Sequence, residues 1–453
     1  MNIRFYNAKI LVLNEDETLP GAASAGEIPS GESSSEEIFS IEEGELWVKD
    51  DRICYIGAAP AGYFENTGAG APLIWSRQID CEGNLLMPGL KNAHAHTYMT
   101  FLRNFADDLP LQQWLYQICF PMEEHLNAEN IRPLEVLGIM EYLAGGVTSA
   151  FDMCYFPPVM ADVAARCGFR SVQVSGVNSF GGDLDVVEEN YLRVNERSPL
   201  TSFLIGFHAE YTTQLDMMKG IARLAEKYQS PVFLHNSETA KETAQCVQRW
   251  GKTPTQLTDA LGMYAFGGGG FHCIYFDDKD FEIYKERGLY AVSCPASNLK
   301  LASGIMPLAR FVDAGIGTAL GTDGAASNNR LDMFREMYLA SVLAKVREGD
   351  AACISAEKIL HMATVQGARA MQLPECDRLA PGKKADLILI DLARPNMQPP
   401  NNLVKNLVYS AGTRNVKLTM VDGKILYEDG QFFIGADPKD IYREAETFVQ
   451  SLK

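Results

Sequence analysis

Two histidines one residue apart, His94 and His96, are the first residues of this chain whose spacing could do chemistry. Pro88-Gly89, a dipeptide typical of turns, lies just upstream of them. On a strand, residues two apart point to the same face, so the two imidazoles would lie side by side. Imidazole pairs of this kind are typical of zinc sites. Two polar residues on an exposed strand face would show the same spacing, so the position of the other histidines decides between the two interpretations.

The elements that must position these histidines follow from a pattern that begins at residue 85. Continuous apolar runs alternate with helix-like stretches such as 217–228, 307–314 and 332–346. This is typical of parallel strands joined by crossover helices. The eight runs cover residues 85–96, 148–153, 171–177, 203–210, 231–238, 270–274, 289–295 and 315–323. Eight units predict an α/β fold, a (β/α)₈ TIM-type barrel. A doubly wound open sheet is the alternative, but no Gly-x-Gly-x-x-Gly follows the first run.

The two ends of the chain carry strand patterns without intervening helices. The strand signals cover 3–12, 45–57, 385–391, 415–421 and 424–427, and the last two flank Asp422-Gly423, a hairpin signature. We expect a small β-sandwich domain built from both ends, with a terminal helix over 437–453. The predicted parts are therefore residues 1–84, a barrel over 85–379, and residues 380–453. Residues 15–43, rich in Ser, Gly, Ala and Glu, predict a low-complexity surface loop without a function of its own.

Active sites of such barrels lie at the C-terminal ends of the strands. Five of the seven histidines fall in that region, as does one aspartate: His94, His96, His208, His235, His272 and Asp323. Each has an ordinary alternative, because His208 or His272 could be a core histidine and Asp323 a turn residue. Together they are harder to explain in that way, and they predict a metal site. The other two histidines, His125 and His361, lie in helix-like stretches, where we expect solvated or packed roles.

The residue types suit hydrolytic metal chemistry. Three neutral imidazoles and a carboxylate can hold Zn²⁺ and leave a position for water. Binding lowers the pKa of that water toward ~7, which yields hydroxide at neutral pH. A carboxylate that is not a ligand must then move protons. Glu238, three residues after His235, is close enough for this role, although it could instead cap the following helix.

The chain resembles a known family, the amidohydrolase superfamily, over nearly its whole length. Within that superfamily it is similar to the S-adenosylhomocysteine/5′-methylthioadenosine deaminases and their cytosine-deaminase-like relatives. The motifs that carry the resemblance are 87–96, 102–115 (LRNFADDLPLQQWL), 235–238, 293–304 (SCPASNLKLASG), 321–332 (GTDGAASNNRLD) and 382–387.

The resemblance implies a role for each candidate residue. The implied metal ligands are His94, His96, His235 and Asp323. By the same resemblance, Glu238 is the general acid/base that moves a proton from water to the purine ring nitrogen, and Asp323 passes a proton to the departing ammonia. His272 would stabilise the attacking hydroxide or the oxygen of the tetrahedral intermediate. The implied substrate contacts are His208, Trp114 near the purine, and Glu123 at the ribose hydroxyls.

The chain also departs from that pattern. The homocysteine-type enzymes tend to carry an arginine before the glycine after the third run, whereas this chain has Ser175, which cannot clamp a carboxylate as a guanidinium does. Arg103 or Arg170 could take its place. The fourth run has no lysine to bridge two metals, which favours one metal ion. Iron or manganese could occupy the same ligands as zinc.

The sequence thus predicts a zinc-dependent aminohydrolase that releases ammonia from an aminopurine, an adenosine-type nucleoside, through a zinc-bound hydroxide. One alternative is the same mechanism on a guanine, pterin, triazine or cytosine ring. A second is a non-catalytic scaffold with this fold, which the intact set of ligands disfavours.

Composition limits where the protein acts and on what. The 58 acidic and 40 basic residues give a formal net charge of −18, which argues against nucleic acid and anionic membranes as partners. We expect no secretory signal, because no basic segment followed by an apolar stretch is evident near residue 1, and no apolar run is long enough to cross a bilayer. Ten cysteines without a CxxC pair indicate reduced, mostly buried thiols. We expect a cytoplasmic homo-oligomer with a small-molecule substrate.

Overall fold

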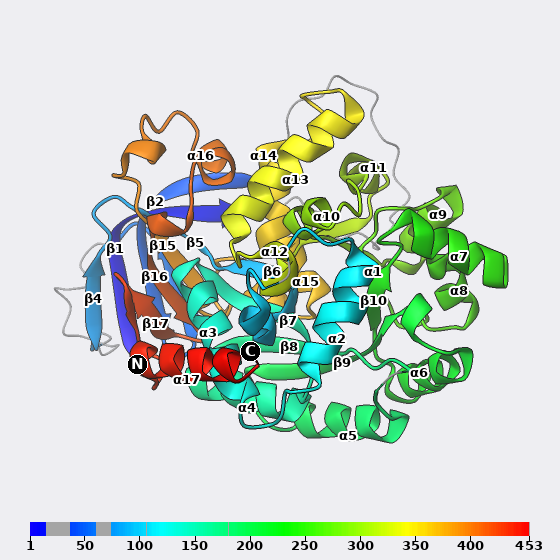
Figure 1. Cartoon of the computed structure of the whole chain (residues 1–453). Helices are drawn as coiled ribbons and strands as arrows, with labels where there is room; N and C mark the ends of the chain where they lie inside the picture. Colours follow the sequence, from blue (N-terminus) through cyan, green and yellow to red (C-terminus); the bar gives the residue numbers. More distant parts are fainter. Residues whose placement is uncertain (15–36, 60–73, 106, 180, 453) are drawn as a thin grey trace.

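A computed structural model describes residues 1–14, 37–59, 74–105, 107–179 and 181–452. It consists of a barrel of parallel strands with a mixed sheet beside it (Figure 1). The barrel strands are β6 (Leu90–His96), β7 (Val147–Cys154), β8 (Arg170–Ser175), β9 (Thr201–Ala209), β10 (Val232–Asn236), β11 (Gly268–His272), β12 (Tyr290–Ser293), β13 (Gly317–Leu320) and β14 (Asp323–Gly324).

The barrel closes through its last predicted run. That run forms β13, which pairs with β12, and β14, which pairs with β6 at the other end of the sheet. All the pairs along this path are parallel. The predicted (β/α)₈ barrel is therefore confirmed.

Helices connect these strands and cover the outside of the barrel (Figure 1). They are α3 (Ile131–Ala144), α4 (Pro157–Cys167), α5 (Leu184–Asn195), α6 (Leu215–Tyr228), α7 (Ala240–Trp250), α8 (Pro254–Ala260), α9 (Asp278–Arg287), α10 (Pro295–Lys300), α11 (Leu308–Asp313), α12 (Ala325–Asn328) and α13 (Met333–Glu348). Three of them, α6, α11 and α13, fall on the helix-like stretches predicted from the sequence.

Both chain ends build the second sheet, in the order β18-β17-β16-β15-β5-β1-β2-β3, with β4 beside β1. Its strands are β1 (Asn2–Leu13), β2 (Phe39–Lys49), β3 (Arg52–Gly57), β4 (Arg77–Asp80), β5 (Leu85–Pro88), β15 (Leu387–Ile390), β16 (Val416–Val421), β17 (Lys424–Glu428) and β18 (Gln431–Phe432). The predicted β domain from both ends is confirmed, and α17 (Pro438–Ser451) is the predicted terminal helix.

Two sequence-based boundaries are wrong. The run over 85–96 is two strands, because β5 pairs with β1 and β15 in the terminal sheet and only β6 enters the barrel. Its residues are buried nearly throughout, so hydrophobicity alone does not mark the break. The predicted loop over 15–43 ends too late, since β2 already pairs with β1 from Phe39 onward. Residues 15–36 of that loop lie outside the described residues.

Short helices complete the chain. Near the barrel mouth are η1 (Thr97–Leu102), α1 (Leu111–Trp114), η2 (Leu115–Cys119), α2 (Phe120–Glu123) and η3 (Glu210–Thr212). After the barrel come α14 (Ala356–His361), η4 (Met362–Gln366), α15 (Gly367–Ala370), η5 (Pro374–Cys376), η6 (Pro395–Met397), α16 (Leu403–Tyr409) and η7 (Thr413–Asn415).

A buried ion pair joins the barrel to the terminal sheet. Arg170, at the start of β8, donates to both carboxylate oxygens of Asp386 at 2.7 and 3.0 Å. The backbone N–H of Asp422 donates to the same carboxylate at 2.7 Å. Burial alone would raise the pKa of Asp386, but the Arg170 guanidinium outweighs it and lowers that pKa to about 2.

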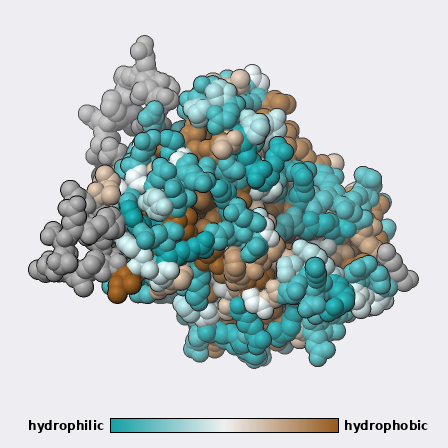
Figure 2. All heavy atoms as spheres, turned by 90° about the vertical axis from the view of Figure 1, so that its left-hand side faces the viewer, coloured by the Kyte–Doolittle hydropathy of each residue, from teal (hydrophilic) through white to brown (hydrophobic). Residues whose placement is uncertain are grey.

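The cysteines and the surface agree with the composition. All ten cysteines are free and eight of them are buried. Seen from the side of the terminal sheet, the surface is mostly hydrophilic, with hydrophobic side chains in smaller groups among the hydrophilic ones (Figure 2). No helix among the described residues has both the length and the apolar character needed to span a bilayer.

Candidate metal centre and active site

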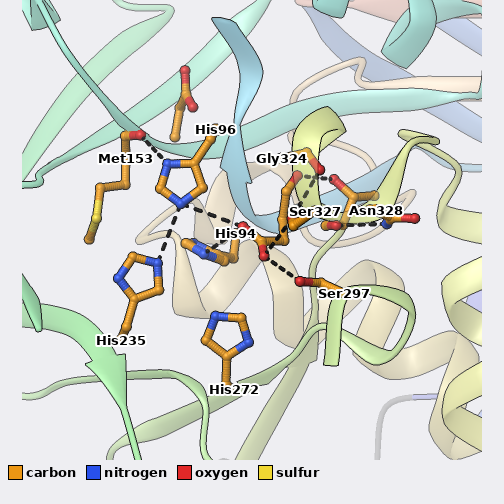
Figure 3. Close-up of polar contacts among 12 residues, drawn as sticks. His94, His96, Met153, His235, His272, Ser297, Gly324, Ser327 and Asn328 are labelled. Atoms are coloured by element: carbon orange, nitrogen blue, oxygen red, sulfur yellow. Dashed lines mark hydrogen bonds and ion pairs between the residues drawn. The ribbon is translucent and has the colours of Figure 1, made fainter. Parts of the chain in front are cut away.

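Three histidines from two strands point at one another inside the barrel (Figure 3). His94 and His96 come from β6 and His235 from β10, and each offers a ring nitrogen within 4.8 Å of the others. The Nε2 atoms of His96 and His235 are 3.3 Å apart. Asp323 Oδ1 lies 3.5 Å from His94 Nε2 and 3.5 Å from His96 Nε2. The four predicted ligands therefore converge, although they are far apart in the chain.

The hydrogen bonds around these rings test whether a cation fits between them. The Nδ1 atoms of His96 and His235 lie 2.7 and 2.8 Å from the carbonyl oxygens of Met153 and His208. A carbonyl only accepts, so each Nδ1 carries the proton and each Nε2 keeps a lone pair. Two facing lone pairs cannot hydrogen-bond to each other, but a metal ion accepts both. The donor set thus fits a divalent cation.

His94 supports the same conclusion. Its side chain is fully buried, and its two ring nitrogens have no hydrogen-bond partner among the described residues. Its ring stacks on Phe271, with the ring centroids 3.8 Å apart. Burial lowers the pKa of His94 to about 3 and also lowers the pKa values of His96 and His235. Neutral imidazole is the form that binds metals.

The two carboxylate oxygens of Asp323 have different surroundings: one faces the histidines and the other accepts hydrogen bonds from two serines. Its Oδ2 accepts hydrogen bonds from the hydroxyls of Ser297, at 2.6 Å, and Ser327, at 2.8 Å. Burial would raise the pKa of Asp323, but the neighbouring His94 and His96 hold it well below its ordinary value. The backbone before Asp323 passes close to β6, since a Cβ on Gly321 would lie 2.7 Å from the backbone nitrogen of His94. Only glycine allows this approach.

Glu238 is aimed at the same place by a sharp turn. Ser237, directly after β10, has a left-handed φ of 53°. The backbone N–H groups of residues 237, 238 and 239 all donate to the Glu242 carboxylate, which fixes the turn before α7. Ser303 Oγ donates to Glu238 Oε1 at 3.1 Å. Burial, with a further contribution from Asp323, raises the pKa of Glu238 above its ordinary value, which suits a carboxyl that must both take and give a proton.

His272 ends β11 in a left-handed conformation, with φ of 74°. Its Nδ1 lies 2.7 Å from Asn298 Oδ1, so the ring donates its Nδ1 proton there. Its ring stacks against that of His235 at a centroid distance of 5.4 Å. Residues 237, 272 and 323 all adopt left-handed backbone at strand ends, where strain often accompanies function.

These side chains form the inner end of a cavity of about 280 Å³. His96, His235, His272, Glu238 and Asp323 line it, and the buried ring of His94 packs beside those of His96 and His235. The three predicted substrate contacts, His208, Trp114 and Glu123, line the same cavity. Its outer wall comes from η1, from the continuous helical segment α1-η2-α2, and from the loops after β7 and β8.

The hydrogen bonds of the predicted substrate contacts leave acceptor atoms available to a ligand. Thr212 Oγ1 donates to the Ala209 carbonyl, so it accepts from His208 Nδ1 at 3.0 Å and leaves His208 Nε2 with a lone pair. Tyr98 OH donates to Glu123 Oε1 at 2.6 Å, and Tyr155 bonds the same carboxylate. Burial raises the pKa of Glu123 to about 7.

Both arginines suggested as substitutes at the Ser175 position are committed elsewhere. Arg103 pairs with Glu141 and also donates to the Asn329 carbonyl. Arg170 pairs with Asp386, and neither arginine lines the cavity. His125 is exposed and His361 is buried, as expected of residues outside the site.

The sequence alone gave no role to several residues that contact the site residues, namely Ser297, Asn298, Ser303, Ser327, Tyr98 and Tyr155. Four of them lie inside the motifs 293–304 and 321–332, which was the signal that could have found them.

A parallel barrel with histidines and an aspartate at its strand ends defines a class of metal-dependent barrel hydrolases. The Amidohydrolase family matches this chain over residues 85–426, and the chain belongs to that family.

Individual relatives resemble most of the chain. A 5-methylthioadenosine/S-adenosylhomocysteine deaminase of Nitratidesulfovibrio vulgaris (strain DSM 19637 / Miyazaki F) is 38% identical over 399 residues, 86% of this chain and 89% of the relative. A protein of the same name from Pyrococcus furiosus is 36% identical over 401 residues, 87% of this chain and 93% of the relative. Among solved structures, an adenosine deaminase from Xanthomonas campestris with bound zinc has a TM-score of 0.87 and 29% identity, covering 100% of this chain and 98% of that one.

Proposed function

We propose that this protein is a deaminase that hydrolyses the exocyclic amine of an adenosine-type nucleoside and depends on one divalent metal ion. The observation that carries the proposal is the convergence of three neutral histidines and one carboxylate at the inner end of the cavity that Glu238 and His272 also line. The relatives named as deaminases of adenosine-type compounds support this substrate class.

His94, His96, His235 and Asp323 would hold the metal. When bound there, a divalent ion acidifies a water molecule and so supplies a nucleophile at neutral pH. Zinc suits this donor set, and iron or manganese can use the same one. The zinc in the Xanthomonas relative supports zinc here.

The side chains of this protein then handle the protons. Glu238 takes a proton from the attacking water and gives it to the ring nitrogen beside the carbon that bears the amine. Asp323 would take the second proton of that water and pass it to the amine, which leaves as ammonia, while the ring carbon keeps the oxygen of water. His272, oriented by Asn298, lies where it can stabilise the oxygen during attack. His208 and Trp114 would contact the purine, and Glu123 would accept hydrogen bonds from the ribose hydroxyls.

Ammonia release tests the proposal. Metal-loaded protein is incubated with adenosine, 5′-methylthioadenosine, S-adenosylhomocysteine, guanine, cytosine, a pterin and an aminotriazine. We expect turnover of the adenine nucleosides. Turnover of only the other rings would move the protein to the alternative substrates. No turnover in protein that binds metal stoichiometrically would favour a non-catalytic scaffold.

We also propose a cytoplasmic homo-oligomer in which residues 1–84 and 380–453 together form the terminal domain and residues 85–379 the barrel, except for β5, which belongs to the terminal sheet. The ten free thiols and the acidic composition support the location. Light scattering on the purified protein tests the oligomeric state, and cell fractionation tests the compartment.

A further inference from the structure

The two ends of the cavity differ in their side chains. The inner end carries the histidines, Glu238 and Asp323. The outer wall, built by the loops after β7 and β8 and by the start of α5, is largely apolar, with Phe156, Val177 and Val186 among its residues. Its charged or polar residues include Asp183 and Asn190, and Ser175 lines the cavity where β8 ends below this wall. Among the described residues that line this cavity, none is a lysine or an arginine.

This lining matters for the part of a nucleoside that lies beyond the ribose. With the adenine amine at Glu238 and the ribose hydroxyls at Glu123, the 5′ substituent extends toward the outer wall. An α-amino-acid tail is a zwitterion, and its ammonium could pair with Asp183. Its carboxylate would still lose hydration without gaining a cationic partner, and it would lie near the acidic Glu123 and Asp183. A thioether methyl group would only exchange water for contact with apolar side chains.

Arginines do lie nearby, in a separate cavity that shares Phe156, Pro157, Val186 and Asn190 with the main one. They are Arg132, Arg193 and Arg197. Asp162 pairs with Arg132 at 3.3 Å and with Arg197 at 2.8 Å. To reach Arg132 or Arg197, a tail would have to leave the main cavity and compete with the Asp162 carboxylate. Arg193 also lies outside the lining of the main cavity, so a tail would have to enter the second cavity to meet it.

We propose that this protein selects adenine nucleosides with an uncharged 5′ tail, such as 5′-methylthioadenosine, over those with an α-amino-acid tail, such as S-adenosylhomocysteine. The inference rests on the proposed function and specifies the substrate of the same site. Ser175, at the end of β8, is the position where the absence of a cation is decisive, since its side chain lines the cavity and is 5% exposed.

Steady-state kinetics with three substrates test the inference. We expect kcat/KM for S-adenosylhomocysteine to be at least about tenfold below that for 5′-methylthioadenosine. The methyl ester of S-adenosylhomocysteine, which is larger but lacks the carboxylate charge, should recover most of the difference. A ratio below about tenfold, or an ester as poor as the acid, would overturn the charge-based selection.

Two variants at one position separate charge from size. Ser175→Arg should raise the ratio of S-adenosylhomocysteine to 5′-methylthioadenosine turnover by about tenfold, because it adds a guanidinium to the wall. Ser175→Met, of similar length and uncharged, should not raise it. If Arg193→Met or Arg197→Met instead lowered turnover of S-adenosylhomocysteine alone, the tail would bind in the arginine cavity and the inference would be wrong.

Binding distinguishes failure of the inference from failure of the proposed function. Calorimetry with metal-loaded Glu238→Gln, whose turnover is strongly slowed, measures the affinity for both nucleosides. A preference of about tenfold or more for 5′-methylthioadenosine would sustain the inference even if the wild type released no ammonia. Equal affinities, together with turnover by the wild type, would refute the inference and leave the deaminase proposal intact.

Discussion

The inner and outer walls of the cavity are built from different parts of the barrel. The inner wall consists of residues at the ends of β6, β10, β11 and β14. Their rings and carboxylates are held by a backbone carbonyl, an amide or a hydroxyl, except for His94, whose ring stacks on Phe271. The outer wall comes from short helices and loops, and the helical segment α1-η2-α2 contains a π-helical turn at Leu115–Cys119. Such turns often lie at functional sites.

This difference suggests that the inner wall carries out the chemistry and that the outer wall selects the substrate. Strand ends are fixed by the hydrogen-bond ladder of the sheet, so they can hold ligands to within the small tolerances that metal binding and proton transfer need. Loops vary without loss of the barrel, so they suit the choice of substrate. Changes to the inner wall should therefore abolish activity, and changes to the outer wall should alter KM and preference.

The largest effect is expected from His235→Ala on the inner wall. The variant loses one of three imidazoles, so it should purify with little bound metal and lose activity by several orders of magnitude. Elemental analysis and ammonia release measure both. His125→Ala, which removes an exposed histidine, is the matched control and should keep both. Full metal content in His235→Ala would show that the ligand set is wrong.

A smaller but still large effect is expected from Glu238→Gln. It keeps the size of the side chain and the ligands but removes the proton shuttle, so kcat should fall about 100- to 10,000-fold with metal content unchanged. Wild-type kcat in this variant would contradict the assigned role. Loss of metal would instead mean that Glu238 helps to hold the ion.

The inner wall was also the part that the sequence predicts best. His94, His96, His235, His272 and Asp323 could be found because a barrel brings strand ends together and because histidine is rare in this chain. The residues that hold them, such as Ser297 and Asn298, could not, since serine and asparagine are common and their partners are set by loop geometry.

The same limit applies to the fold. Eight apolar runs predict a closed barrel, but the division of the first run into β5 and β6 depends on which sheet each half joins. The sheet that each half joins is determined by tertiary pairing, of β5 with β1 and β15 and of β6 with β7. Hydrophobicity along the sequence does not reveal this pairing. The suggestion that Arg103 or Arg170 could supply the arginine missing at Ser175 was wrong for a related reason. Both are already paired, and their partners Glu141 and Asp386 are too distant in sequence for the pairing to be predicted.

On the outer wall, Glu123→Gln should act on substrate binding. Burial raises the pKa of Glu123 to about 7, so the carboxylate that accepts ribose hydroxyls is present above that pH and lost below it. The kcat/KM of the wild type should therefore fall as the pH drops through about 7. In Glu123→Gln that dependence should disappear and KM should rise about tenfold, with kcat much less affected. A KM close to that of the wild type would exclude this contact.

The smallest effect on chemistry is expected far from both walls, at the Arg170–Asp386 pair. Arg170→Met leaves a buried carboxylate without its cation, which should lower the free energy of unfolding by about 3–5 kcal/mol while the metal centre keeps its ligands. Because the pKa of Asp386 is about 2 in the folded protein and ordinarily 3.8, its stabilising contribution is complete above about pH 4 and lost as the pH falls through 2. Denaturant unfolding at several pH values measures this, with Arg166→Met as the control at an exposed ion pair expected to cost less than about 1 kcal/mol. If Arg170→Met lowered kcat without lowering stability, the junction between barrel and terminal sheet would influence the inner wall, and the separation of chemistry from scaffold would not hold.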